Sequence, residues 1–223
     1  MKKHLTELIG TFVLVFTIGC AVASGSTLAP VSVAAVLMAV IYGGYHISGA
    51  HYNPATTLAV FICKKITLQD GLMYVVFQTI GGTFGAFASY IITENSSNAI
   101  AMMPGSASPL NALFAEIIGT FIMLFVILNV ALLPSKRNNG YYGLAIGFVV
   151  LGISISLGGI SGGAFNPAVG FGRCIASLVT GANDCFSMVW LYMLGPTLGA
   201  TLAAFAFLYL NGTELEEKLE IMN

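Results

Sequence analysis

The tripeptide Asn-Pro-Ala occurs twice in this sequence of 223 residues, as Asn53-Pro54-Ala55 and as Asn166-Pro167-Ala168. Each copy stands at the start of a short apolar stretch. Asn is a favoured N-cap and Pro is favoured at the first helical position, so each copy predicts a helix that begins at its Pro. The asparagine amide can donate hydrogen bonds to a polar molecule, while the helix N-terminus, with about half a positive charge, repels cations. The pair therefore predicts a site for uncharged polar molecules.

The composition places these residues in a membrane. Hydrophobic residues make up 57% of the chain and charged residues only 8%, whereas a soluble domain has about 25% charged residues. The net charge of −1 provides no basic field for a nucleic acid. These values exclude a cytosolic enzyme, a secreted module, a disordered chain and a nucleic-acid-binding protein. The apolar runs are long and do not alternate, so the spans are predicted to be helices.

Six apolar runs have about the 20 residues that a spanning helix needs, and two further runs are too short to cross. The short runs begin at the two Asn-Pro-Ala copies and predict re-entrant half-helices. The predicted fold is therefore an all-α membrane protein with six transmembrane helices and two re-entrant half-helices. The spans are predicted at Leu8–Leu28, Val31–Ser48, Leu72–Ile92, Leu110–Leu133, Tyr142–Leu157 and Phe186–Leu210, and the half-helices at Pro54–Cys63 and Pro167–Val179.

The basic residues predict the orientation, because Lys and Arg concentrate on the cytoplasmic side. With both termini cytoplasmic, Arg173 is the only one of the eight that falls outside. We therefore expect a multi-pass protein of the cell membrane with both termini in the cytoplasm and a solvated acidic tail at Glu214 to Glu220. The other basic residues are Lys2, Lys3, Lys64, Lys65, Lys136, Arg137 and Lys218.

The two halves of the chain resemble each other at three places in the same order. We predict a first repeat at residues 1–105 and a second at residues 106–223. Three spans per repeat reverse the direction of entry, so the repeat is inverted, an arrangement that places a site near the bilayer midplane. One Asn-Pro-Ala copy alone is explained equally well as an ordinary helix cap, whereas two in matched contexts are not. The matches join 6–12 with 115–121, 47–55 with 160–168, and 78–81 with 196–199.

This arrangement resembles the aquaporin, or major intrinsic protein, family over essentially the whole chain. The resemblance rests on the two Asn-Pro-Ala copies in matched contexts between the right spans. It implies a homotetramer with one pore per subunit, in which Asn53 and Asn166 donate to a passing water and the carbonyls of residues 49–52 and 162–165 accept from it. The implied partners are water, small neutral solutes and membrane lipid, and no cofactor or metal is implied.

Three titratable residues near the predicted pore have alternative roles. Glu7 and Glu116 lie about one turn inside apolar spans, where a carboxylate is costly. The resemblance implies that they brace the pore loops by hydrogen bonds, which we favour over a proton relay. His51 is a possible gating residue if it titrates at the cytoplasmic mouth.

The predicted outer constriction departs from the pattern of water-selective members. Their arginine three residues after the second Asn is replaced here by Val169, and Arg173, one turn further along, is expected to face away. The resulting ring is wider and less polar, so we expect passage of ammonia, urea, hydrogen peroxide or glycerol besides water. By family spacing, the other ring positions are Val33, Gly163 and either Ser154 or Ile155.

Two rival functions are weighed against a channel. The string Gly159-Ile160-Ser161-Gly162 fits rhomboid proteases, but every histidine precedes Ser161, so a general base is missing downstream and we do not predict an enzyme. A poorly conducting structural or signalling member of the same fold remains the alternative. Cys174 and Cys185 both fall near the outer face, where they form either a disulfide or two small apolar side chains.

Overall fold

The structure, a computed structural model, describes residues 1–136, 139–182 and 184–221, with the side chains of 213–221 outside the description. Within these ranges it contains helices and no strand. Eight α-helices form the molecule: α1 (Lys2–Ala23), α2 (Ala29–Ser48), α3 (Pro54–Ile62), α4 (Leu68–Ile92), α5 (Pro109–Ala131), α6 (Tyr142–Ser161), α7 (Pro167–Thr180) and α8 (Val189–Ile221). Three 3-10 turns connect them: η1 (Ser97–Ala99), η2 (Pro134–Lys136) and η3 (Cys185–Met188).

The six long helices are long and apolar enough to cross a membrane, which confirms the six predicted spans. Four of them begin before the predicted residue, and the largest differences are at α1, which begins at Lys2, and α4, which begins at Leu68. Hydropathy detects only the stretch that suits hydrocarbon, whereas polar first turns continue each helix beyond it. Lys3 Nζ lies 2.7 Å from Asp70 Oδ2, so these two polar first turns also hold α1 to α4.

The last helix extends furthest beyond its prediction, because α8 continues from Val189 through Ile221. It therefore includes the backbone of the predicted acidic tail. The side chains of Glu214 to Glu220, Lys218 among them, lie outside the described part of the chain, as does Arg137.

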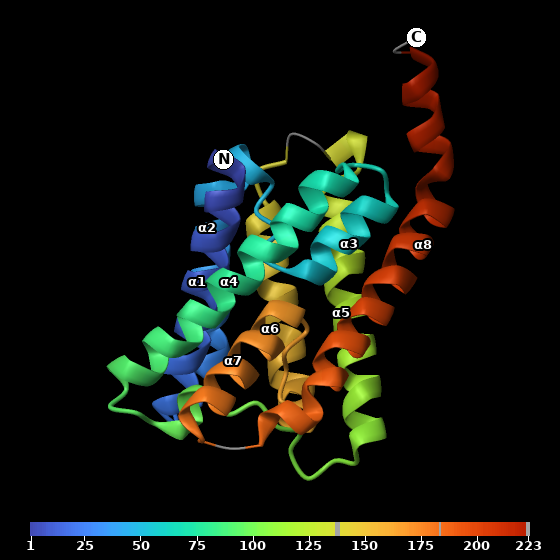
Figure 1. Cartoon of the computed structure of the whole chain (residues 1–223). Coiled ribbons are helices and arrows are strands. Elements are labelled where there is room, and N and C mark those ends of the chain that lie inside the picture. The colour runs from blue at the N-terminus through green and yellow to red at the C-terminus, as the bar shows by residue number, and fades with distance from the viewer. Residues whose placement is uncertain (137–138, 183, 222–223) are drawn as a thin grey trace.

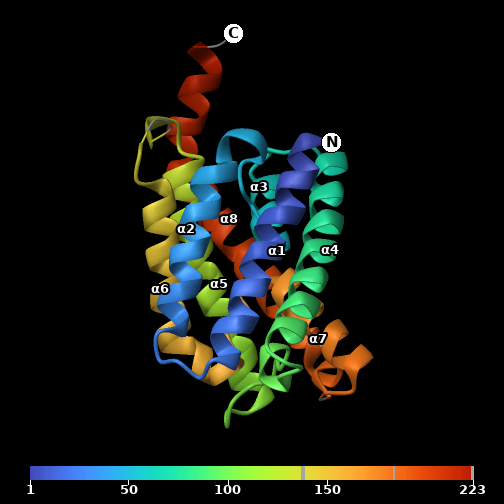
Figure 2. The same cartoon turned by 90° about the vertical axis from the view of Figure 1, so that its left-hand side faces the viewer.

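The long helices stand side by side around the two short ones (Figure 1; Figure 2). Both chain termini lie at the same end of the molecule. Helix α1 runs away from that end and α5 runs toward it, so the two halves enter from opposite ends. Helices α3 and α7 lie in opposite halves of the bundle, and their N-termini point toward its middle.

Close approach of helices depends on small residues at two equivalent contacts. A Cβ atom at Gly81 of α4 would collide with the carbonyl oxygen of Leu8 on α1. In the second half, a Cβ atom at Gly199 of α8 would collide with the carbonyl oxygen of Ile117 on α5. The backbones of α1 and α4, and of α5 and α8, therefore touch, as small-residue faces permit.

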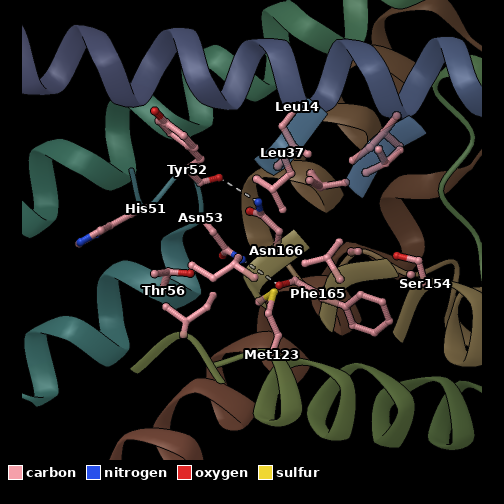
Figure 3. Close-up of a pocket in the computed structure, with 18 of the residues that line it drawn as sticks. Leu14, Leu37, His51, Tyr52, Asn53, Thr56, Met123, Ser154, Phe165 and Asn166 are labelled. Carbon is pink, nitrogen blue, oxygen red and sulfur yellow. Dashed lines mark hydrogen bonds between the residues drawn. The ribbon is translucent and has the colours of Figure 1, made fainter. Parts of the chain in front are cut away.

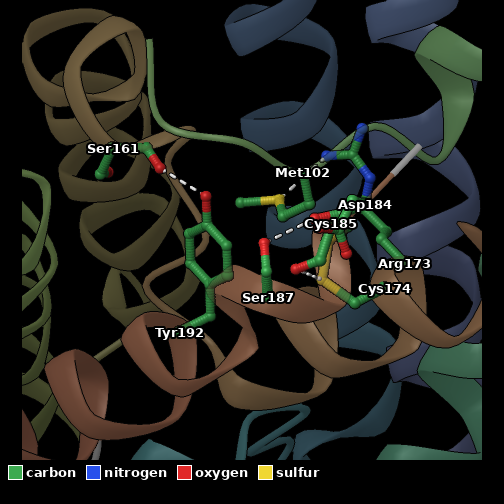
Figure 4. Close-up of a disulfide and its surroundings, with 8 residues drawn as sticks. All are labelled: Met102, Ser161, Arg173, Cys174, Asp184, Cys185, Ser187 and Tyr192. Atoms are coloured by element: carbon green, nitrogen blue, oxygen red, sulfur yellow. Dashed lines mark hydrogen bonds between the residues drawn. A yellow bond between two sulfur atoms is a disulfide. The ribbon is translucent and has the colours of Figure 1, made fainter. Parts of the chain in front are cut away.

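A disulfide joins Cys174 of α7 to Cys185 at the start of η3 (Figure 4). The structure thus selects the first of the two alternatives for this pair. Of the remaining cysteines, Cys20 and Cys63 are free. The bond joins the middle of α7 to the segment that leads into α8.

Candidate functional site

Each half-helix begins at an asparagine cap. Asn53 Oδ1 accepts a hydrogen bond of 2.8 Å from the Ala55 N–H, and Asn166 Oδ1 accepts one of 2.9 Å from the Ala168 N–H. Pro54 and Pro167 follow at the first helical position, where the missing N–H costs nothing. The cap explains why both helices start at the repeated tripeptide.

The two asparagines also join the half-helices to each other. Asn53 Nδ2 donates to the carbonyl oxygen of Phe165 at 3.0 Å, and Asn166 Nδ2 donates to the carbonyl oxygen of Tyr52 at 2.9 Å (Figure 3). An amide nitrogen carries two N–H groups, so each asparagine retains one for a further acceptor. The two positive helix ends therefore meet at one point in the middle of the molecule.

A cavity of about 490 Å³ passes this meeting point. Its wall includes Val22 and Ala29, near one end of the bundle, and Tyr45 and Ala131, near the other. Both asparagines and both preceding loops lie in the same wall. One passage therefore runs past the paired asparagines toward both ends of the protein.

Glu7 holds the first pore loop, residues 49–53. Its carboxylate accepts hydrogen bonds from the His51 N–H at 3.0 Å and the Tyr52 N–H at 2.6 Å. The Ser48 hydroxyl donates to the same carboxylate at 2.6 Å, and the Gln78 side-chain amide also donates to it, at 2.8 Å. Every one of these donors belongs to the chain itself, so the carboxylate is occupied by bracing.

Glu116 holds the second pore loop, residues 162–166, in the same way. It accepts from the Ala164 N–H at 2.9 Å, the Phe165 N–H at 2.7 Å and the Ser161 hydroxyl at 2.7 Å. The position that matches Gln78 in the repeat is Pro196, which has no side-chain donor. Sequence reasoning missed the role of Gln78, although this one difference within an otherwise matched segment was the available signal.

The backbone of both pore loops leaves the helical direction. Gly49 and Gly162 end α2 and α6 in the left-handed region, with φ of 84° and 93°. Tyr52 and Phe165 follow with φ of 50° and 46°, which is uncommon for residues with a side chain. The carboxylate bonds to the neighbouring N–H groups hold this conformation in place.

Both pore loops line the cavity, and their N–H groups form hydrogen bonds within the protein. In the first loop, the N–H groups of Ala50, His51 and Tyr52 all bond to Ser48 or Glu7. Only the Tyr52 carbonyl of residues 49–52 accepts a bond from another residue in the described part of the chain. The Tyr52 and Phe165 carbonyls each accept one bond from the opposite asparagine. A carbonyl oxygen has a second lone pair, so the four acceptors per loop stay a prediction.

The wall around these carbonyls is apolar. Leu14 and Leu37 approach the asparagines from α1 and α2, and Met123 approaches from α5 (Figure 3). Near the asparagines, the two loops therefore supply most of the hydrogen-bond partners that a solute meets, and Thr56, Ser154 and Arg173 add polar groups elsewhere in the wall. Further apolar residues of this wall are Ile18, Ile41, Ile127, Ile146 and Val150.

Four of the five predicted ring residues line the cavity. They include Ser154, whereas the alternative Ile155 does not line it and is 65% exposed on the surface of α6. Adjacent helical residues point about 100° apart, so only one of the two can face the same passage. The residues that line the cavity are Val33, Ser154, Gly163 and Val169.

Arg173 corrects the sequence-based expectation. It was expected to face away from the passage, but it lines the same cavity as Val169. Residues four apart lie on the same face of a helix, so an arginine one turn after Val169 points to the same side. The spacing alone contained this signal.

His51 lies between α2 and α3, outside the six apolar helices. Its Nδ1 is 3.0 Å from the Thr57 hydroxyl and its ring packs edge-on against Tyr74. Burial lowers the pKa of the imidazole to about 4, so the neutral ring predominates as long as the pH stays well above that value.

We therefore expect water flux to be flat between about pH 5.5 and 8, because His51 gains its proton only as the pH falls toward its lowered pKa. Light scattering of proteoliposomes at stepped pH measures this. His51→Gln serves as the comparison and should give the same flat profile. A step in flux near the ordinary pKa of histidine, removed by His51→Gln, would contradict the expectation.

Comparison with known proteins places this geometry in a family. The family model for Major intrinsic protein matches residues 1–207. The chain is 31% identical to Aquaporin AqpM of Methanothermobacter marburgensis, covering 94% of this chain and 97% of that protein. It is 35% identical to Glycerol uptake facilitator protein-like 6 of Lactiplantibacillus plantarum, covering 92% and 96%.

A solved structure agrees with the sequence relatives. The X-ray structure of the aquaglyceroporin from Plasmodium falciparum superposes with a TM-score of 0.83 at 25% identity, covering 91% of this chain and 93% of that one. The agreement therefore extends over nearly the whole fold. The chain belongs to the major intrinsic protein family.

Proposed function

We propose that this protein is a passive membrane channel for water and small uncharged solutes. The observation that carries the proposal is the meeting of two asparagine-capped half-helices in the wall of one elongated cavity. The names of the relatives, which include an aquaporin and a glycerol uptake facilitator protein, support the same class of activity.

The paired asparagines supply the chemistry at the midpoint. A water there accepts the remaining N–H of Asn53 and of Asn166 and so cannot also accept a bond from its neighbour in the file. Proton hopping along the file is interrupted as a result. The two helix N-termini add a positive potential that raises the energy of a cation at the same point.

The ring near Val169 sets the size of the solute. Val33, Ser154, Gly163 and Val169 are small or apolar, and no long side chain from these positions divides the passage. Ammonia, urea, hydrogen peroxide and glycerol are therefore proposed as solutes besides water.

Stopped-flow light scattering of proteoliposomes tests the channel. We expect water, urea and glycerol gradients to relax faster with the protein than in empty liposomes, without a matching proton leak. Folded protein that leaves all relaxation rates at the level of empty liposomes would instead support the alternative, a poorly conducting structural or signalling member of the same fold.

A serine protease is not favoured by the surroundings of Ser161. Its hydroxyl is fully buried, donates to Glu116 and accepts from the Gly163 N–H at 3.1 Å. These contacts assign it to the brace of the second loop and leave no open approach for an acyl substrate.

We also propose a homotetramer, with a repeat boundary after residue 105 and both termini in the cytoplasm. The shared end of the two termini and the disulfide at the opposite end support this orientation, because disulfides persist in oxidising compartments. Light scattering coupled to size exclusion measures the subunit number, and labelling of terminal tags on sealed cells measures the side.

A further inference from the structure

Arg173 is a buried cation in the wall of the passage. The residue is only 3% exposed, although it lines the cavity. Nη1 donates to the Met102 sulfur at 3.4 Å (Figure 4). Nη2 donates to the Asn98 carbonyl at 3.2 Å, and Nε is buried without a hydrogen-bond partner. The guanidinium is thus held in place by two neutral acceptors.

No carboxylate neutralises this charge among the described residues. Asp184 lies in the same region, but it forms no ion pair with Arg173 (Figure 4). An arginine is charged at any physiological pH. Burial of an unpaired charge is costly, so its retention at a passage indicates a functional role.

The charge lies outward of the constricting ring. Arg173 follows Val169 by one turn of α7, and α7 runs from the middle of the molecule toward the end with the disulfide. The segment between α4 and α5, which supplies Asn98 and Met102, also contributes Ala101 and Met103 to the cavity wall. One outer segment therefore both borders the passage and fixes the arginine.

We propose that Arg173 is a specificity-determining residue that excludes cations at the outer mouth without narrowing the ring at Val169. In this arrangement charge selection and size selection are separated by one helical turn. The channel then admits neutral solutes larger than water and rejects their protonated forms. The inference rests on the proposed function as a channel.

The size of the effect follows from Coulomb's law. A unit charge a few ångströms from a passage at the protein–water boundary changes the partitioning of a monovalent cation by at least about tenfold. Neutral solutes do not experience this term, so their flux should change little.

Arg173→Gln in proteoliposomes tests the inference, with a pH-sensitive dye for proton flux and valinomycin-clamped potassium gradients. We expect the cation leak to rise by at least about tenfold, and urea flux to stay within about twofold of the unmodified protein. Arg173→Lys, which keeps the charge, should restore low leak. Lys2→Gln, a charge removed from the exposed start of α1, controls for net charge.

A second pair of variants leaves Arg173 in place. Val169→Asp puts a carboxylate four residues before the arginine, within reach of an ion pair on one helix face, and Val169→Asn is its uncharged match. The leak of Val169→Asp should exceed that of Val169→Asn by about tenfold.

The inference is overturned if Val169→Asp and Val169→Asn show equal cation leaks. It is also overturned if Arg173→Gln elutes normally in size exclusion and its cation leak is unchanged. Water flux through the unmodified protein is read separately and tests the proposed channel function. A protein that conducts no water contradicts the proposed channel function, whereas a conducting protein whose cation leak does not depend on Arg173 contradicts only this inference.

Discussion

Substitution of Glu116 by leucine is expected to abolish water flux and to destabilise the folded protein by about 3 kcal/mol or more, because buried donors lose their acceptor. The Ala164 N–H, the Phe165 N–H and the Ser161 hydroxyl all donate to this carboxylate. Without these bonds nothing holds the backbone of Phe165 in the left-handed region. The Phe165 carbonyl, which accepts the hydrogen bond from Asn53, is then expected to move away. Stopped-flow water flux and the thermal midpoint of the detergent-solubilised protein measure the two effects.

Two further variants make this result specific. Ile118→Ala changes a half-exposed side chain on the same helix and should leave flux and thermal midpoint near those of the unmodified protein. Glu116→Gln keeps one carbonyl acceptor and should fall between the two. Normal flux through a folded Glu116→Leu protein would show that the loop does not depend on the carboxylate.

Substitution of Val169 by arginine is expected to lower urea and glycerol flux by at least about tenfold while water flux is reduced much less. Val169 is buried and lines the passage together with Gly163 and Ser154. A guanidinium at this position crosses the ring and leaves room for little more than a water. Parallel swelling assays with water, urea and glycerol gradients measure the selectivity.

The comparison variant here is Val169→Met, which adds length without charge or fixed donors. It should reduce solute flux less than Val169→Arg because an unbranched, flexible side chain can move aside. If Val169→Arg leaves urea and glycerol flux unchanged, this ring does not set solute size and the account of the filter is wrong.

Several features of the protein could be predicted from local chemistry alone. Low charge and long apolar runs indicate six spanning helices. Six of the eight α-helices in the structure are long and apolar enough to be these spans. Asn53-Pro54 and Asn166-Pro167 predict helix starts because capping is decided by adjacent residues, and both half-helices begin there. The matched segments of the two halves also predict the inverted repeat and indicate the family. Helix ends were less accurate, since polar first turns such as that of α4 carry no hydropathy signal.

Other features depend on how helices rotate and loops dock, which only the tertiary structure decides. Helix α6 is made of apolar and small residues around its whole circumference, so its sequence does not distinguish Ser154 from Ile155. The bonds from Asn53 and Asn166 to opposite loops, and from Gln78 to Glu7, join residues far apart in the chain. The orientation of Arg173 follows from helical spacing, but the outer segment that holds it reaches it only through the fold. Contacts between distant segments are set by packing, and local sequence preference does not encode them.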